Sequence, residues 1–296
     1  MPHLYRTFFF SVLLGAAAAP AAQAQSLVSG FLPGKGHGSV VISATQERYQ
    51  SVYLAPEKID QVPIFERVAV SSLNLYGSYG ITSRLEAVVS LPYIQSRGFA
   101  EEQVLRDQNY VNKRAGLQDL TVLLKAKLYS VELGTSALDV LGVVSGSTPV
   151  SDYKSDTGLG YIIAIGNGAR KVSAQGVAHL KLVSGMFLTG QAGYSVRDNS
   201  APNAFVAEAK LGYAAPKLYV DALASFQKSD KSGTDILQPG FTGFFPATRV
   251  DFVRLGVSAF RPVAKGFGVT VGGFTYVAGR NVGKATGGSA GVAYNF

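Results

Sequence analysis

The stretch DLTVLLKAKLY, residues Asp119–Tyr129, decides the fold, because polar and apolar side chains alternate along most of it. Side chains of a β-strand point to opposite faces in turn, so the pattern predicts a strand with two unlike faces. The apolar face carries Leu120, Val122, Leu124, Ala126 and Leu128. The other face carries Asp119, Thr121, Leu123, Lys125, Lys127 and Tyr129.

The composition indicates that such strands cross a membrane. Hydrophobic residues make up 47% of the 296 residues and charged residues only 16%, against about a quarter in soluble domains. No apolar run reaches the roughly 20 residues that a membrane-spanning helix needs. An all-β transmembrane barrel explains both facts, since its outer face is apolar, its lumen is polar, and closure leaves no unpaired edge.

Alternating segments of this kind recur along the chain, with short and long connections in turn. They predict an antiparallel up-and-down barrel of about twelve strands. The expected strands span residues 39–53, 67–79, 83–94, 116–129, 137–147, two strands within 158–196, then 204–213, 217–228, 248–261, 268–279 and 287–296. For the turn between the sixth and seventh strands, residues 174–176 and 184–185 fit equally well. The longest predicted outer loops are residues 95–115 and 229–247.

The two ends of the chain predict its destination. Residues 1–24 have the order of a cleavable signal peptide: a basic residue, a short apolar run and Ala22-Gln23-Ala24. Residues 25–296 are then the barrel. The last strand ends at Phe296 and resembles the signal that barrel-assembly machinery reads in outer-membrane proteins of Gram-negative bacteria. We therefore expect a protein of the cell outer membrane.

Charged residues on the predicted inner faces are candidates for lining the lumen. They are Glu86, Asp119, Lys125, Lys127, Glu208, Lys210, Asp221 and Arg254. One interpretation is that acids and bases pair to brace a narrow barrel, because buried charges are costly unless paired. The other is that they form a charged constriction that selects a solute. The pattern alone leaves both interpretations open.

Three aromatic residues in the predicted loop 229–247 are candidates for the outer mouth: Phe241, Phe244 and Phe245. They would either make a hydrophobic site where a solute enters or pack the loop over the top of the barrel.

Several other classes of site find little support in the sequence. There is no cysteine, no phosphate-binding glycine motif and no metal-ligand cluster, so neither a cofactor nor a metal is expected. The triplet His37-Gly38-Ser39 has the spacing of outer-membrane lipases, but it lies in a glycine-rich lead-in to the first strand. The net charge of +8 comes from scattered cations, which favours lipopolysaccharide and membrane lipids over nucleic acid as partners.

Several turns resemble one barrel family. The turn YGITSRLE (Tyr79–Glu86), the following Leu91-Pro92-Tyr93 and the Gly116–Leu120 start of a strand resemble the meta-pathway of phenol degradation proteins. Ser147-Thr148-Pro149 and Gly158-Leu159-Gly160 are further similarities. The resemblance implies a barrel of about twelve strands that takes up hydrophobic or aromatic molecules.

The sequence thus predicts an outer-membrane channel that passes a small hydrophobic or aromatic solute through a narrow lumen. A non-conducting structural or adhesion barrel and a lipid-modifying enzyme are the alternatives. Whether the lumen is open or plugged is left undecided.

Overall fold

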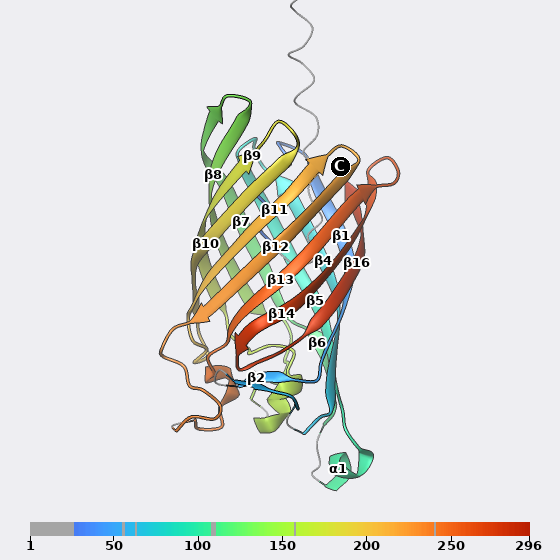
Figure 1. Ribbon diagram of the computed structural model, residues 1–296, viewed down its shortest axis with the longest axis vertical. Helices are drawn as coiled ribbons and strands as arrows, with labels where there is room; N and C mark the ends of the chain where they lie inside the picture. The colour runs from blue at the N-terminus through green and yellow to red at the C-terminus, as the bar shows by residue number, and fades with distance from the viewer. Residues whose placement is uncertain (1–26, 55–56, 63, 108–110, 157, 240) are drawn as a thin grey trace, which may run out of the picture.

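The computed structural model describes residues 27–54, 57–62, 64–107, 111–156, 158–239 and 241–296. These residues form a closed antiparallel β-barrel (Figure 1), which confirms the predicted all-β architecture. We call each of its twelve wall strands a stave, and one stave consists of two strands in succession. The predicted signal peptide, residues 1–24, lies outside the described residues and remains a prediction.

Each stave pairs with its neighbours in chain order, and the last stave pairs with the first. The staves are β1 (Gly38–Tyr49), β4 (Arg67–Gly80), β5 (Leu85–Phe99), β6 with β7 (Lys113–Leu117 and Asp119–Leu133), β8 (Ser136–Pro149), β9 (Lys171–Lys181), β10 (Met186–Arg197), β11 (Ala204–Ala215), β12 (Leu218–Ser229), β13 (Asp251–Pro262), β14 (Phe267–Arg280) and β16 (Thr286–Asn295). Strands β6 and β7 form a single stave, interrupted at Gln118, because both pair with β5. Closure comes from the pairing of β1 with β16, in which Ser39 lies opposite Asn295.

The connections differ sharply between the two ends of the barrel. At one end, which we call the short-turn end, the turns are residues 81–84, 134–135, 182–185, 216–217 and 263–266. Both chain ends of the described barrel also lie here (Figure 1). At the other, long-loop end, the connections are residues 50–66, 100–112, 150–170, 198–203, 230–250 and 281–285. Of the two turns left open by the sequence, the structure therefore selects the one that contains Ser184 and Gly185.

The long-loop end carries small elements of its own. They are a three-stranded sheet of β2 (Val52–Leu54), β3 (Glu57–Ile59) and β15 (Val282–Gly283), the helix α1 (Glu102–Asp107), and the 3₁₀ turns η1 (Gly158–Ile163) and η2 (Phe245–Ala247). Two predicted boundaries are corrected here. The loop predicted for residues 95–115 is shorter, since β5 continues to Phe99 and β6 begins at Lys113. The sixth strand starts at Lys171, because residues 158–163 turn into η1 instead of extending.

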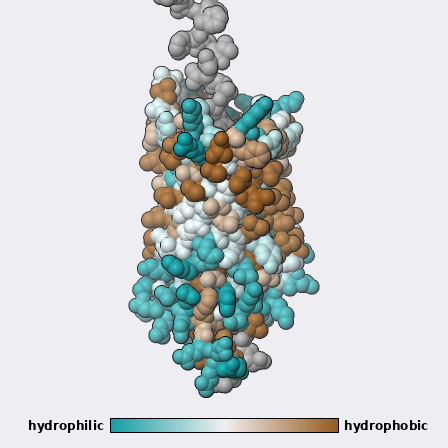
Figure 2. All heavy atoms as spheres, turned by 90° about the vertical axis from the view of Figure 1, so that its right-hand side faces the viewer, coloured by the Kyte–Doolittle hydropathy of each residue, from teal (hydrophilic) through white to brown (hydrophobic). Residues whose placement is uncertain are grey.

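The outer face is an apolar belt that alternates with a buried inner face. Exposed large apolar side chains include Ile42, Leu75, Val122, Leu188, Leu211, Val257, Val271 and Val292, on eight different staves. Figure 2 shows apolar residues over much of one side of the barrel and hydrophilic residues gathered toward the long-loop end. Among the described residues, no helix is long and apolar enough to cross a membrane.

One predicted inner residue is on the outer face. The pairing of β7 with β8 shifts register between Lys127 and Tyr129, where Leu128 has no partner of its own. A bulge of this kind reverses the alternation beyond it. Tyr129 is consequently 60% exposed on the outside, although strict alternation from Lys125 predicts an inward side chain.

Candidate functional site

The interior at the short-turn end is filled by the chain's own N-terminal segment, residues 27–34. The Nζ atom of Lys125 donates hydrogen bonds to the carbonyl oxygens of Ser29 and Phe31, both at 2.7 Å. The Nζ atom of Lys210 donates to the carbonyl oxygen of Val28, also at 2.7 Å. Two lysines from staves on different sides of the barrel thus hold the backbone of this segment inside the lumen.

An aromatic ring anchors the segment between them. The ring of Phe31 lies 4.4 Å from the imidazole of His179, 5.2 Å from the ring of Phe187 and 6.4 Å from that of Tyr219, each measured between centroids. All three contacts are edge-to-face, a geometry that aromatic rings favour. Leu27, Val28 and Leu32 pack against the same apolar cluster as Phe31. The segment therefore closes the short-turn half of the lumen with apolar side chains.

A glycine allows the closest approach of the segment to the wall. A Cβ atom on Gly30 would lie 2.2 Å from the Cγ atom of His179, far inside van der Waals contact. His179 is fully buried, and its Nδ1 atom is 2.7 Å from the hydroxyl oxygen of Thr189. Because that hydrogen bond fixes the imidazole, only glycine fits opposite it.

The same two lysines are paired with wall carboxylates. Lys125 lies 2.6 Å from the Oε2 atom of Glu86, and Lys210 lies 3.2 Å from the Oε1 atom of Glu208. These four side chains are at most 7% exposed. Buried charges of this kind are tolerated only when they are paired and hydrogen-bonded. Each lysine thus neutralises a wall carboxylate and at the same time binds carbonyl oxygens of the segment.

The other four predicted lumen residues also point inward, with partners that the sequence did not single out. Asp119 pairs with Lys171 at 2.9 Å and accepts a hydrogen bond from Tyr153. Lys127 pairs with Asp139 at 3.1 Å.

The last two predicted lumen residues, Asp221 and Arg254, contact other side chains of the barrel wall. Asp221 accepts hydrogen bonds from the hydroxyls of Tyr219 and Ser258. The guanidinium of Arg254 lies over the ring of Phe274, 5.6 Å from its centroid. Six of the eight predicted lumen charges thus have a partner of opposite charge, whereas Asp221 contacts hydroxyls and Arg254 an aromatic ring.

The long-loop end is covered by what we call the lid: the sheet β2–β3–β15, η1 and the loop 230–250. Val52, Leu54, Val62, Phe65, Val68 and Ile163 form its buried apolar cluster. Of the three predicted mouth residues, Phe245 is buried and stacks on Tyr161 at 5.3 Å between ring centroids, and Phe241 meets Phe245 edge-on at 5.0 Å. Phe244 is half-buried at the start of η2. Burial raises the pKa of Tyr161 to about 12, so its hydroxyl is neutral over the physiological range.

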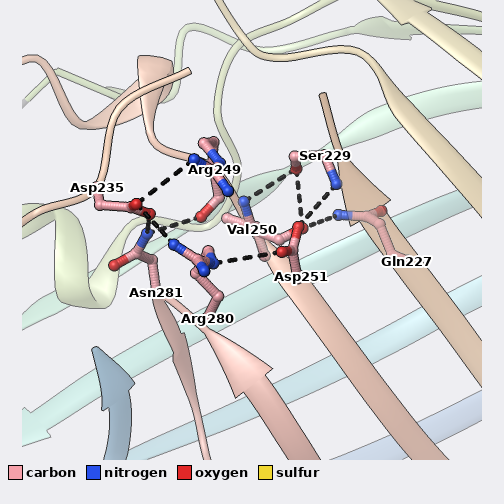
Figure 3. Close-up of polar contacts among 8 residues, drawn as sticks. All are labelled: Gln227, Ser229, Asp235, Arg249, Val250, Asp251, Arg280 and Asn281. Carbon is pink, nitrogen blue, oxygen red and sulfur yellow. Dashed lines mark hydrogen bonds and ion pairs between the residues drawn. The ribbon is translucent and has the colours of Figure 1, made fainter. Parts of the chain in front are cut away.

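A polar network ties the lid to the barrel rim (Figure 3). The carboxylate of Asp235 accepts a hydrogen bond from Arg280 at 2.6 Å and one from the side-chain amide of Asn281 at 2.9 Å. Arg249 lies 3.6 Å from the same carboxylate, and Arg280 also reaches Asp251 at 3.4 Å. Asp235 thereby fastens the loop 230–250 to the end of β14, and the carbonyl oxygen of Arg249 adds a second attachment by accepting a hydrogen bond from Asn281 at 2.8 Å.

The alternative catalytic triplet has its two side chains in different surroundings. Ser39 is buried on the inner face, where its hydroxyl lies 3.1 Å from that of Ser78. The Nδ1 atom of His37 is exposed and lies 3.3 Å from the carbonyl oxygen of Phe296. The enzyme hypothesis requires both side chains to face lipid, and Ser39 does not. Within the part of the chain that the structure describes, no group of His, Asp and Glu is arranged to hold a metal ion.

The N-terminal segment is the feature that sequence reasoning missed. Leu27, Val28, Phe31 and Leu32 form a short apolar run between the predicted signal peptide and the first strand. Four large apolar side chains in so short a run would be costly to expose to water, and this signal would have indicated a buried segment.

Comparison with solved structures supports the fold. The chain superimposes on an outer membrane channel from Pseudomonas putida F1 with a TM-score of 0.68 and 16% identity, covering 92% of this chain and 100% of that one. The fold is that of a solved outer-membrane channel. The predicted resemblance to a channel family is thereby confirmed at the level of the fold.

Other outer-membrane barrels are more distant. The β-domain of the Bordetella autotransporter BrkA matches with a TM-score of 0.44 and 16% identity over 88% of this chain and 99% of that one. No protein-family model and no curated protein match the chain.

Proposed function

We propose that this chain is a channel of the bacterial outer membrane that passes small hydrophobic or aromatic solutes and rests in a closed state. The apolar belt supports a membrane location, because so large an apolar surface is costly in water. In outer-membrane barrels the short turns face the periplasm and the long loops face outward. The N-terminal segment then closes the periplasmic half, and the lid covers the extracellular end.

The observation that carries the proposal is how the N-terminal segment is held. Hydrogen bonds from an ammonium group contribute about 1.5–3 kcal/mol each, and burial of a phenylalanine ring a similar amount. Reversing a two-state equilibrium from 1:99 to 99:1 takes about 5.5 kcal/mol. A solute that replaces the ring and part of the hydrogen bonding supplies a free energy of this size, so the closure is reversible.

Release of the segment leaves no charge unpaired. Lys125 and Glu86 lie opposite one another on the neighbouring strands β7 and β5, and Lys210 and Glu208 lie on the same strand, β11. Both ion pairs therefore belong to the wall and persist when the segment leaves. The large cost of stranding a buried charge does not oppose opening.

The wall behind the segment favours apolar solutes. Its buried apolar residues are Val41, Tyr76, Val88, Leu123, Leu141, Val143, Val177, Phe187, Tyr219 and Phe260. Lumens of general porins are polar. Once Phe31 has left, a solute with an aromatic ring would meet the same edge-to-face partners that Phe31 has in the closed state.

Conductance tests the proposal. The mature protein in planar bilayers is expected to show rare current steps, and a variant that lacks residues 27–33 is expected to conduct steadily. Leu133→Ala, a change to an exposed side chain near the short-turn end, is the matched control and should behave as the parent. Aromatic solutes should increase the open time of the parent protein. They should reduce the current through the truncated variant, because they occupy its lumen.

The buried N-terminal segment also supports a second candidate, a non-conducting structural barrel. In that case the truncated variant, correctly folded, would remain silent. For assembly, we propose that the machinery reads the C-terminal strand, since Phe296 is 47% exposed and stacks with Tyr294 and Tyr79 on the outer face.

A further inference from the structure

Four cations stand side by side on the outer face near the long-loop end. Arg48 of β1 lies opposite Ala69 of β4, Ala69 lies opposite Arg97 of β5, and Arg97 lies opposite Lys113 of β6. Arg67 lies two residues from Ala69 on the same face. We call Arg48, Arg67, Arg97 and Lys113 the basic row. It crosses four adjacent staves, on the side of the barrel that Figure 2 faces.

The alternation of the strands shows that the basic row faces outward. Arg48 shares its face with Ile42, which is 54% exposed in the apolar belt, and Arg97 shares its face with Tyr93, which is 46% exposed. At about 3.4 Å per residue, Arg48 lies roughly 20 Å along the strand from Ile42. The cations therefore lie beyond the apolar belt, on the side of the long loops.

Their charge is not neutralised within the described barrel. Among the described residues, no ion pair involves any member of the basic row. The guanidinium groups of Arg67 and Arg97 lie over the ring of Phe99, at 4.2 and 5.0 Å from its centroid. The nearest acids in sequence are Glu47, which points into the barrel, and the exposed Glu66. Adjacent like charges held in this way attract an external anion.

A polar recess adjoins the row. It has a volume of about 390 Å³ and is lined by Gln46, Glu47, Arg48, Arg67, Ala69, Thr286, Gly287 and Gly288, of which Glu47 has its side chain on the inner face. Gly288 leaves the outer face of β16 without a side chain opposite Gln46, beside Arg48. Gln46 accepts a hydrogen bond from Ser71 at 2.7 Å, so the edge of the recess is also polar.

We propose that the basic row and this recess bind the phosphate groups of a lipopolysaccharide molecule in the outer leaflet. Guanidinium groups bind phosphate through two parallel hydrogen bonds, and the row offers three of them. The belt below it, including Ile42 and Leu73, offers an apolar surface to the acyl chains of the same molecule. The proposal rests on the outer-membrane location proposed above, but not on conduction.

The test compares two triple variants of the mature protein in detergent, with purified lipid A as the probe. Arg48→Ala, Arg67→Ala and Arg97→Ala together remove the row's guanidinium groups. Lys35→Ala, Lys217→Ala and Lys265→Ala remove the same charge from exposed positions at the short-turn end. The first variant should lose about tenfold or more in affinity, whereas the control should change less than about twofold.

Dephosphorylated lipid A and inorganic phosphate identify the ligand. Dephosphorylated lipid A should bind the parent as weakly as phosphorylated lipid A binds the first variant. Inorganic phosphate alone should not protect the parent against thermal unfolding. Equal loss of affinity in both triple variants would show unspecific attraction and overturn the proposal, as would unchanged affinity in the first.

Two further arms separate the possible failures. If the first triple variant does not fold, Arg48→Ala alone carries the test, since this exposed side chain has no ion pair in the described structure, and a loss below about twofold then overturns the site. Conductance is measured in bilayers free of lipopolysaccharide. A protein that binds lipid A but never conducts would contradict only the proposed conduction. A protein that conducts but does not bind lipid A would contradict only this site.

Discussion

The Nζ atom of Lys125 lies 2.7 Å from the carbonyl oxygen of Ser29 and 2.6 Å from the carboxylate of Glu86. One buried amine thus joins two neighbouring staves and the chain's own N-terminal segment. In the closed state that we propose, this contact opens without breaking the wall, because the carboxylate stays with the lysine when the carbonyl oxygen leaves.

Removal of the aromatic anchor should favour the open channel. Phe31→Ala takes away the ring that contacts His179, Phe187 and Tyr219. A buried Phe→Ala change costs about 3–5 kcal/mol, and here the cost falls on the closed state. Single-channel recording should show a much larger open fraction, while the thermal unfolding of the barrel changes by only a few degrees. An open fraction equal to that of the parent would contradict the anchor role.

A bulky residue at Gly30 should expel the segment by a different route. Gly30→Val places side-chain atoms within the space of the His179 ring, so the segment cannot seat. We expect the conductance of the truncated variant, and partial return to closure when His179→Gly is added, because the Cβ atom of His179 itself lies 2.7 Å from the Cβ position of residue 30. Gly146→Ala is the control, because a Cβ atom there meets nothing within 4 Å. Failure of the second change to restore closure would argue against the steric explanation.

Breaking the Lys125–Glu86 pair should be costly, unlike loss of the segment. Lys125→Met leaves the buried Glu86 carboxylate uncompensated, which typically costs about 3–5 kcal/mol. Urea unfolding in lipid vesicles should show this loss, and the double variant with Glu86→Gln should recover most of it. If the double variant is as unstable as the single one, the pair does not act as a unit within the wall.

The strands were predictable from the sequence, whereas the N-terminal segment inside the lumen and the lid over the long-loop end were not. Alternation with inward Lys125 and Lys210 identifies a stave whether or not its neighbours are known, and the twelve-stave barrel follows from counting such segments. The bulge at Leu128 breaks the rule locally, which is why Tyr129 was predicted on the wrong face. Residues 158–163 are apolar enough for a strand, but they cover the lid cluster as η1.

Only part of the candidate site could be predicted from the same alternation. Inward charges follow from period-two alternation, but their partners depend on register. Asp119 of β7 meets Lys171 of β9, and Lys127 meets Asp139 across the β7–β8 hairpin. The N-terminal segment makes contacts 94–182 residues away, and no local pattern encodes them.

Loss of the carboxylate at Asp235 should free the loop 230–250. Asp235→Ala removes the acceptor shared by Arg280 and Asn281. The loop should then be cut by chymotrypsin at Phe241 or Phe244 several-fold faster than in the parent, because cleavage follows the population of the open loop. Lys231→Ala, an exposed charge in the same loop, should leave the rate unchanged. Equal rates in the two variants would mean that the network does not fasten the lid.

The most direct test of the closed lumen uses the absence of native cysteine. Gly30→Cys with His179→Cys places two thiols within reach of each other after a small outward shift of the segment. The Cβ position of Gly30 lies 2.7 Å from the Cβ atom of His179, and a disulfide spans about 3.5–4.5 Å between Cβ atoms, so that oxidation locks the segment to the wall. Single-channel current is then recorded before and after a reductant. We predict a silent oxidised channel that begins to conduct on reduction, whereas the cysteine-free parent does not respond to the reductant. Equal current in both states, or silence in both, would contradict closure of the lumen by residues 27–34.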